Sequence, residues 1–151
     1  PLTAYDDLSA FKIYLSDIGL LRKLAEVPVA ALVTKDDVIG FREFKGAFAE
    51  NYVLQSLSTQ STVNLRYWTS NNSAEVDFLL QYDTHILPIE VKSGKSTSSR
   101  SLTLYNADKH PILRIRYSDK ELKLDDNLLN IPLYMADWTF ALLKAAIAHR
   151  S

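Results

Sequence analysis

The fold of this chain is decided by residues 74–92, which read AEVDFLLQYDTHILPIEVK. Two strand-like runs lie here, Ala74 to Tyr82 and His85 to Lys92, with the alternating or short apolar pattern typical of β-strands. A third such run, Asn64 to Thr69, precedes them, separated by the turn sequence Ser70-Asn71-Asn72-Ser73. The three runs predict an antiparallel meander. Pro88 lacks a backbone donor and indicates a strand start or a sheet edge at that point.

The stretch before the meander predicts a helix from Phe41 to about Leu57. Aromatic residues recur there at spacings of three and four and mark one apolar stripe: Phe41, Phe44, Phe48 and Tyr52. Glu50 lies on the opposite side, within a second apolar stripe, which is unusual for a carboxylate on a solvent face. Glu50 is therefore a candidate functional residue, although a helix carboxylate paired with a nearby lysine would give the same pattern.

The segments that follow the meander complete an αβββαβ order. A helix is expected over roughly Ser99 to Ala107 and a strand over Ile112 to Tyr117. Outside this core the pattern predicts four further elements: a strand at Phe11 to Leu15, a helix at Ile18 to Ala25, a short strand near Glu121 to Leu124 and a helix at Asp137 to His149. The prediction is an α/β fold with a sheet flanked by helices.

Four side chains could form a reactive site. Glu90 and Lys92 are two apart in a strand and therefore share a face. If Asp77 on the preceding strand faces the same way, two carboxylates converge beside one ammonium, and Glu50 from the packed helix adds a third. Such oxygen ligands suit Mg²⁺ or Mn²⁺. Lys92 would then orient the attacking water and steady a phosphate.

Composition limits the function classes. The 151 residues suit one domain, the formal charge of −1 gives no bulk attraction to nucleic acid, and the absence of cysteine excludes thiolate sites. No apolar run approaches the ~20 residues that cross a bilayer, and we expect a cytoplasmic protein. The chain starts at Pro1, so we expect a fragment of a longer protein. Residues 85–123 hold eight basic and four acidic residues, a local +4.

These motifs resemble two nested families. Asp77, then Glu90-Val91-Lys92, with a helical Glu50 in an αβββαβ order, resembles the PD-(D/E)xK nuclease superfamily of restriction-endonuclease-like folds. Phrases across the chain also resemble the DUF4143 family, the C-terminal domain of AAA-type ATP-binding proteins. Those phrases are Phe11 to Leu21, Gly46 to Val53, Tyr67 to Ser70, Ala74 to Phe78, Ile89 to Gly94 and Asn130 to Tyr134.

The resemblance implies the following. Residues 41–151 would be a nuclease-like domain and residues 1–40 an extension packed on it. Asp77, Glu90 and Glu50 would hold Mg²⁺ or Mn²⁺ for hydrolysis of DNA, with Lys92 as the fourth catalytic residue. ATP would bind only in an N-terminal ATPase domain outside this chain. Ala49 and Val76 depart from the family and superfamily patterns, at positions that would not contact the ion.

Blander interpretations stay open. Asp77, Glu90 and Lys92 could form a surface ion pair worth at most about 1 kcal/mol. The domain could be a non-catalytic module through which the ATPase recognises nucleic acid or a partner, or an oligomerisation domain that uses the last helix. Tyr67 and Trp68 could stack a base, although such a pair is more often packing. Basic side chains near the site could meet a nucleic-acid backbone or be solvated: Lys95, Arg100, Lys109, Arg114 and Arg116.

Overall fold

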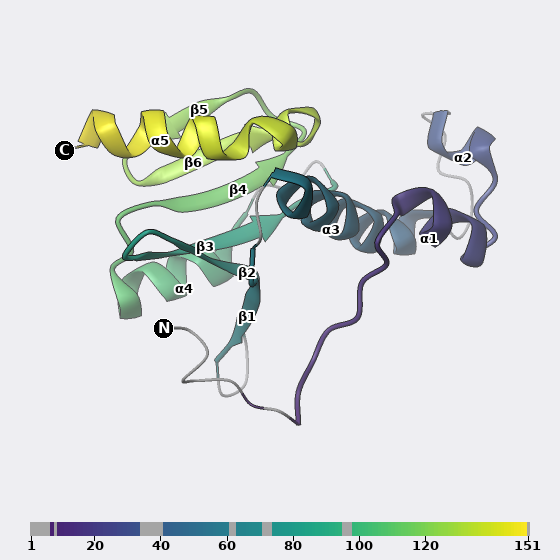
Figure 1. The fold of residues 1–151 in the computed structure, drawn as a ribbon, viewed down its shortest axis with the longest axis horizontal. Coiled ribbons are helices and arrows are strands. Elements are labelled where there is room, and N and C mark those ends of the chain that lie inside the picture. Colours follow the sequence, from purple (N-terminus) through teal and green to yellow (C-terminus); the bar gives the residue numbers. More distant parts are fainter. Residues whose placement is uncertain are drawn as a thin grey trace.

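A computed structural model of the chain describes residues 7, 9–33, 41–60, 63–70, 74–94 and 98–150, with only the main chain for 32–33 and 41–43. Figure 1 shows how its elements are arranged. In chain order they are α1 (Ile18–Leu24), α2 (Val29–Val33), α3 (Phe41–Gln60), β1 (Arg66–Thr69), β2 (Glu75–Tyr82), β3 (His85–Val91), α4 (Arg100–Lys109), β4 (Arg114–Ser118), β5 (Lys123–Asp125), β6 (Leu128–Pro132), the 3₁₀ helix η2 (Leu133–Trp138) and α5 (Thr139–Arg150). The predicted helix, three strands, helix and strand are present as α3 to β4.

The strands form one mixed sheet. Within the described residues it has six strands in the order β1-β2-β3-β4-β6-β5. β1, β2 and β3 pair antiparallel, which confirms the predicted meander, while β4 pairs parallel with both β3 and β6. β5 turns back antiparallel to β6. The turn residues 71–73 between β1 and β2 lie outside the described part. The fold is therefore mixed α/β, with a sheet flanked by helices as predicted.

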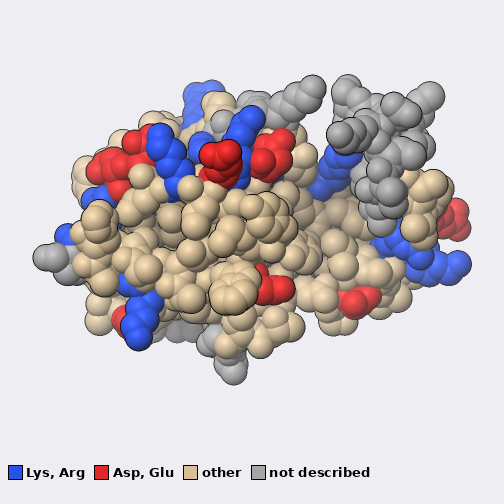
Figure 2. Space-filling view, turned by 90° about the horizontal axis from the view of Figure 1, so that it is seen from above, with Lys and Arg blue, Asp and Glu red and all other residues tan. Residues whose placement is uncertain are grey.

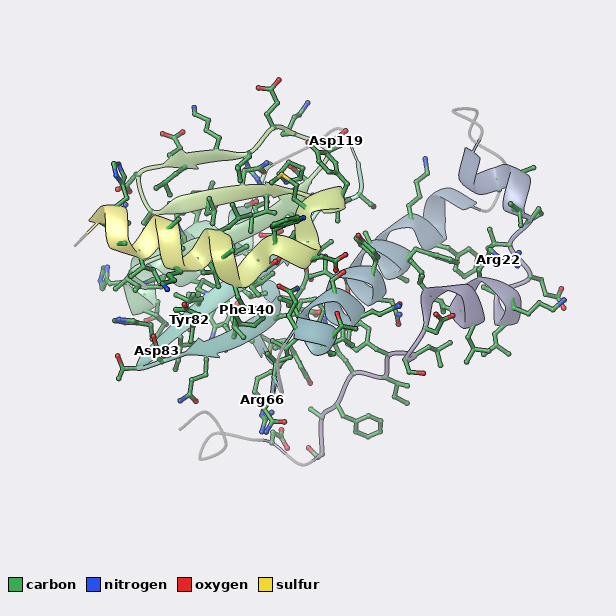
Figure 3. The ribbon with its side chains drawn as sticks, turned by 45° about the horizontal axis from the view of Figure 1, so that its top comes forward. Arg22, Arg66, Tyr82, Asp83, Asp119 and Phe140 are labelled. Atoms are coloured by element: carbon green, nitrogen blue, oxygen red, sulfur yellow. The ribbon has the colours of Figure 1, made fainter. Side chains whose placement is uncertain are left out.

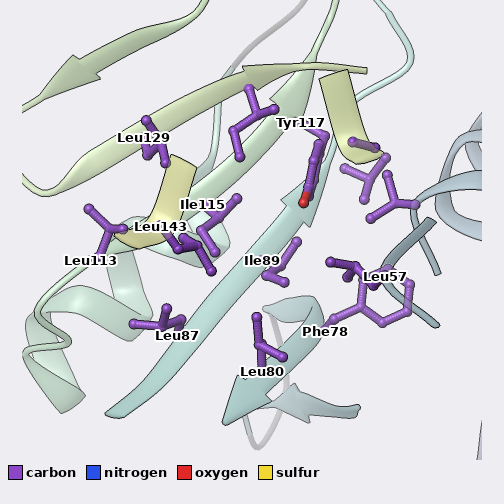
Figure 4. Close-up of a cluster of buried hydrophobic side chains, with 14 of the residues drawn as sticks. Leu57, Phe78, Leu80, Leu87, Ile89, Leu113, Ile115, Tyr117, Leu129 and Leu143 are labelled. Atoms are coloured by element: carbon purple, nitrogen blue, oxygen red, sulfur yellow. The ribbon is translucent and has the colours of Figure 1, made fainter. Parts of the chain in front are cut away.

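The larger core lies between the sheet and helices α3 and α5, as Figure 4 shows. Leu57 of α3, Ile115 of β4 and Leu143 of α5 are all fully buried there. Figure 3 shows Tyr82 of β2 beside Phe140 of α5, and their stacked rings lie 6.2 Å apart between centroids. The predicted C-terminal helix thus covers the sheet of its own chain.

Helix α3 uses both of its predicted apolar stripes. Val53 and Leu57, from the stripe that contains Glu50, are fully buried against the sheet. From the aromatic stripe, Phe48 is buried against α1 and α2, whereas Phe44 is 42% exposed and the Phe41 side chain lies outside the described part. None of the described helices, α3 included, is long and apolar enough to cross a membrane.

A smaller core lies on the opposite face of the sheet. Leu102 and Tyr105 of α4 pack there on Val76 and Leu79 of β2. Tyr105 also holds Trp68 of β1 edge-on, with ring centroids 5.2 Å apart. The beginning of the meander, which carries Asp77, is therefore fixed by packing from α4.

The interpretation of Pro88 as a strand start or sheet edge is wrong. β3 begins at His85 and lies inside the sheet, between β2 and β4. Its pairing with β4 begins only at Ile89, which faces Ile115. The donor that proline lacks is therefore not needed by the neighbouring strand at this position.

The strand predicted at Phe11 to Leu15 is also wrong, because this segment has no sheet partner. Its main chain instead pairs with a side chain of α3. The Leu15 N–H donates to Asn51 Oδ1 at 2.8 Å, and Asn51 Nδ2 donates to the Leu15 carbonyl at 3.0 Å. The Asp17 side chain then caps α1. The segment from Tyr14 to Ala31 thus packs along α3, and the division at residue 40 stays a prediction.

Asn51 gives the first testable expectation. Its side chain is 2% exposed, so Asn51→Ala would leave two backbone groups of the N-terminal segment without partners. We expect the free energy of unfolding to fall by about 2 kcal/mol. Thermal denaturation measures this loss, and hydrogen exchange should accelerate first at Leu15. An unchanged melting temperature with an unchanged exchange rate would contradict this role of Asn51.

Candidate functional site

Asp77 lies where the first two long strands stop pairing with each other. The register of β2 and β3 runs from Tyr82 opposite His85 to Phe78 opposite Ile89. At the next residue the Val91 N–H donates to a side chain instead of the main chain: its acceptor is Asp77 Oδ2, at 2.7 Å. The carboxylate is therefore held next to the Glu90-Val91-Lys92 segment.

The side chains of Glu90, near the end of β3, and Lys92, just after it, lie on the same side, as the two-residue period predicts. Ile89 and Val91 are buried in the larger core, while the Lys92 ammonium pairs with Glu90 Oε1. The Glu90 side chain is only 4% exposed, and its second oxygen, Oε2, is buried without a hydrogen-bond partner among the described residues. The exposed surface pair considered from sequence is therefore wrong for Glu90, which is a buried carboxylate.

Glu50 meets the N-terminal segment rather than a lysine in the described contacts. The Tyr14 hydroxyl donates to Glu50 Oε2 at 3.1 Å, and the Tyr14 ring packs on Phe78 with 5.5 Å between centroids. Burial, reinforced by the negative charge of Glu50, raises the pKa of Tyr14 well above its usual value. Tyr14 therefore stays a hydrogen-bond donor at neutral pH.

The environment of Asp77 shows that the carboxylates are neighbours. Burial raises the pKa of Asp77 from 3.8 to about 6, and the hydrogen bond from Val91 opposes this rise. The charges of Glu50 and Glu90 raise the pKa further, whereas Lys12 lowers it. The structure thus brings Asp77, Glu90 and Glu50 within electrostatic reach of one another.

The raised pKa of Asp77 predicts a pH-dependent stability. Because the folded-state pKa lies above the unfolded value, the folded state binds the proton more tightly and loses stability as pH rises from about 4 to above 6. Asp77→Asn keeps an acceptor for Val91 and removes this loss. In EDTA we expect the variant to be more stable at pH 7.5, on the order of 1–2 kcal/mol, and similar at pH 4. A variant less stable than the wild type at pH 7.5 would contradict the raised pKa.

The geometry does not form a ready-made metal cage. Among the described residues, no three His, Asp or Glu side chains lie close enough to hold an ion together. Glu50 is engaged by Tyr14 and Glu90 by Lys92, so the candidate ligands are adjacent rather than convergent. Two direct carboxylates with water in the other positions is the arrangement common for Mg²⁺.

Three of the five basic residues expected near the site have structural partners. Arg114 Nε donates to Asn127 Oδ1 and Arg116 Nε to Asn130 Oδ1, both at 2.8 Å, while Lys109 pairs with Asp108. Lys95 lies outside the described residues. Figure 2 shows basic and acidic side chains interspersed on the face in view, with uncharged residues between them. The local excess of charge at residues 85–123 does not form one broad basic surface on that face.

Sequence reasoning missed two residues of this neighbourhood, both in the N-terminal segment. Tyr14 binds Glu50, and Lys12 pairs with Glu75 while its ammonium lies 5.3 Å from the centre of the Tyr67 ring. The available signal was the alternation of Lys12 and Tyr14 with Phe11 and Ile13, which indicates two different environments. Without the contacts of Asn51, nothing shows which side faces the site.

Comparison with known proteins agrees with the motifs quoted from sequence. Residues 45–135 match the family model described as a domain of unknown function, DUF4143. This range includes Glu50, Asp77, Glu90 and Lys92. No curated protein and no solved structure gives a significant match. Because the match covers more than half of the 151 residues, the chain belongs to the DUF4143 family.

Proposed function

We propose that this chain is a restriction-endonuclease-like domain of the PD-(D/E)xK type, which hydrolyses phosphodiester bonds of DNA with a divalent cation. The order α3, β1, β2, β3, α4, β4 supports this fold type, as does the spacing in sequence of Asp77 and Glu90-Val91-Lys92, which resembles the motif. The observation that carries the proposal is the buried Glu90 carboxylate, which pairs with Lys92 through Oε1 while its Oε2 has no hydrogen-bond partner among the described residues.

Mg²⁺ or Mn²⁺ fits the chemistry of these donors. A buried carboxylate oxygen without a partner normally costs free energy, and a bound ion would satisfy it. Asp77 and Glu90 would hold the ion, and Glu50 would assist, directly or through water. The ion would supply positive charge that offsets the charge developing on the phosphate.

The remaining roles follow from the contacts. Lys92 is one-third exposed and already lies on Glu90, so its ammonium can reach a phosphate oxygen and orient the attacking water. Asp77 is held in place by the Val91 N–H, which fixes Oδ2 and would leave Oδ1 for the ion. Tyr14 restrains Glu50 through its hydroxyl. These contacts preorganise the charged groups before a substrate arrives.

The wider protein is part of the proposal. The family resemblance supports an AAA-type ATPase N-terminal to this chain, in which ATP would bind, and the whole protein would act in the cytoplasm. The DNA-cutting activity would belong to the present chain. The ATPase would supply its regulation or its delivery to DNA.

Cleavage of supercoiled plasmid tests the function. The wild-type chain should relax or linearise plasmid in Mg²⁺ or Mn²⁺ and not in EDTA. Glu90→Gln should lose the activity, while Asp125→Asn, an exposed carboxylate on β5 at the far edge of the sheet, should keep it. Equal cutting by wild type and Glu90→Gln would show that the activity is a contaminant and would reject the assignment.

A second candidate is a non-catalytic module on the same fold that binds nucleic acid or a partner for the ATPase. The engagement of Glu90 by Lys92, and the absence of three convergent ligands among the described residues, favour it. The same plasmid experiment decides between the two. The module predicts DNA retention without any metal-dependent cutting.

A further inference from the structure

A pocket of about 580 Å³ opens beside the candidate site, between the segment Ala10–Tyr14 and strand β1 at the edge of the sheet. This is a size common for ligand sites. Asp77 lines it, so the pocket reaches one of the candidate carboxylates. Besides Asp7 and several apolar residues, its lining includes aromatic and basic side chains: Phe11, Lys12, Tyr14, Arg66, Tyr67 and Trp68.

Two of the rings in the pocket, those of Trp68 and Tyr67, are held in place by neighbouring side chains. Trp68 lies edge-on against Tyr105, with the two planes at 88°. Lys12 covers one side of the Tyr67 ring and is held there by its ion pair with Glu75. Preformed aromatic walls lose little conformational entropy when a flat ligand stacks on them.

The rim of the pocket exposes an apolar side chain. Phe11 lines the pocket and is 74% exposed, although the nearby Tyr14 is packed inward on Phe78. Figure 3 shows Arg66 projecting from β1 on the side of this N-terminal segment. The entrance therefore offers an aromatic face and a guanidinium, which together match a nucleobase and its phosphate.

We infer that this pocket holds one unpaired nucleotide of the DNA strand that is cut, adjacent to the scissile phosphate. The inference rests on the proposed function, because it places that phosphate at Asp77. The base would stack on the Phe11 and Tyr67 rings, while Lys12 and Arg66 meet the backbone phosphate. A base inside a duplex is stacked and paired on all sides, so only an unpaired base can enter such a pocket. The chain should therefore prefer single-stranded or frayed DNA.

Fluorescence anisotropy with a labelled oligothymidylate in EDTA tests the pocket without any cleavage or metal. Phe11→Ala and Tyr67→Ala should each weaken binding about tenfold or more, the loss typical of one stacked base. Tyr67→Phe should bind like the wild type. Lys12→Met should lower the slope of log affinity against log salt by about 0.7. Tyr134→Ala and Trp138→Ala are matched controls, since these aromatic residues are 79% and 64% exposed and do not line the pocket.

Several outcomes would overturn the inference. Wild-type affinity in the Phe11 and Tyr67 variants would do so, as would an equal loss in Trp138→Ala, tighter binding of a blunt duplex of the same length, or no binding at all. If Phe11→Ala weakened the binding of an apolar peptide and left oligonucleotide binding unchanged, the rim would be assigned to a protein partner instead. Failure of the proposed function gives a different result. If the oligonucleotide binds and the pocket variants weaken that binding, but the chain cuts no DNA in Mg²⁺, cleavage is rejected and nucleotide binding by the pocket is retained.

Discussion

Asp77→Asn is expected to cut DNA about 10³-fold more slowly than the wild type in Mn²⁺, while folding at least as well at neutral pH. The substitution replaces a charged ligand by a neutral amide and keeps an acceptor for the Val91 N–H. The loss should appear in the single-turnover rate on a short single strand. The gain in stability arises because burial next to Glu50 and Glu90 disfavours the charged carboxylate.

A slower cleavage rate together with an unchanged or higher stability distinguishes a reactive site from a structural one. If the carboxylate served only folding, neutralising it would lower the stability of the protein. A carboxylate that serves to bind a cation instead destabilises the protein when no ion is bound, so neutralising it should raise the stability. Asp125→Asn provides the matched control, with both rate and stability unchanged. Asp77→Asn protein that cuts at the wild-type rate would contradict the role of Asp77.

Lys92→Met is expected to lower the free energy of unfolding by about 3 kcal/mol, the second large effect. It keeps the aliphatic stem and removes the ammonium that pairs with Glu90 Oε1, so a carboxylate that is 4% exposed loses its counter-charge. The value lies at the lower end of the range for buried pairs because the Lys92 side chain is one-third exposed. Chemical denaturation at neutral pH in EDTA measures the loss.

A double-mutant cycle identifies its source. If the cost comes from stranding the Glu90 charge, Glu90→Gln combined with Lys92→Met should recover most of the lost stability. If the two losses simply add, the pair does not interact energetically and the ion pair described here is incidental. Both variants should be inactive, so this cycle is scored on stability alone.

The meander and its flanking helices could be predicted because hydrophobic periodicity and turn residues within each short segment encode them. The strand expected at residues 85–92 is present as His85–Val91, and the shared side of Glu90 and Lys92 follows directly from a period of two. Ile131 is part of β6, which lies parallel to β4. That parallel pairing brings together strands distant along the chain, and no periodicity within either strand encodes it.

The errors arise where a side chain replaces a backbone partner. The alternation at Phe11 to Leu15 predicted a strand, but it reflects one exposed and one packed side of a segment held by Asn51, a residue 36 positions away. The contact of Asn51 with Leu15 also positions the neighbouring Tyr14 beside Glu50, and Tyr14 lines the pocket next to Asp77. Sequence patterns supplied the carboxylates and the lysine, and only the tertiary structure supplied the groups around them.

Mn²⁺ binding to the metal-free chain, followed by electron paramagnetic resonance, tests the shared carboxylate site most directly. The account predicts one tight site per chain that is retained in Asp125→Asn and Tyr67→Phe and lost in Asp77→Asn. Signals of free Mn²⁺ that are identical for the wild type and Asp77→Asn would show that these carboxylates hold no ion.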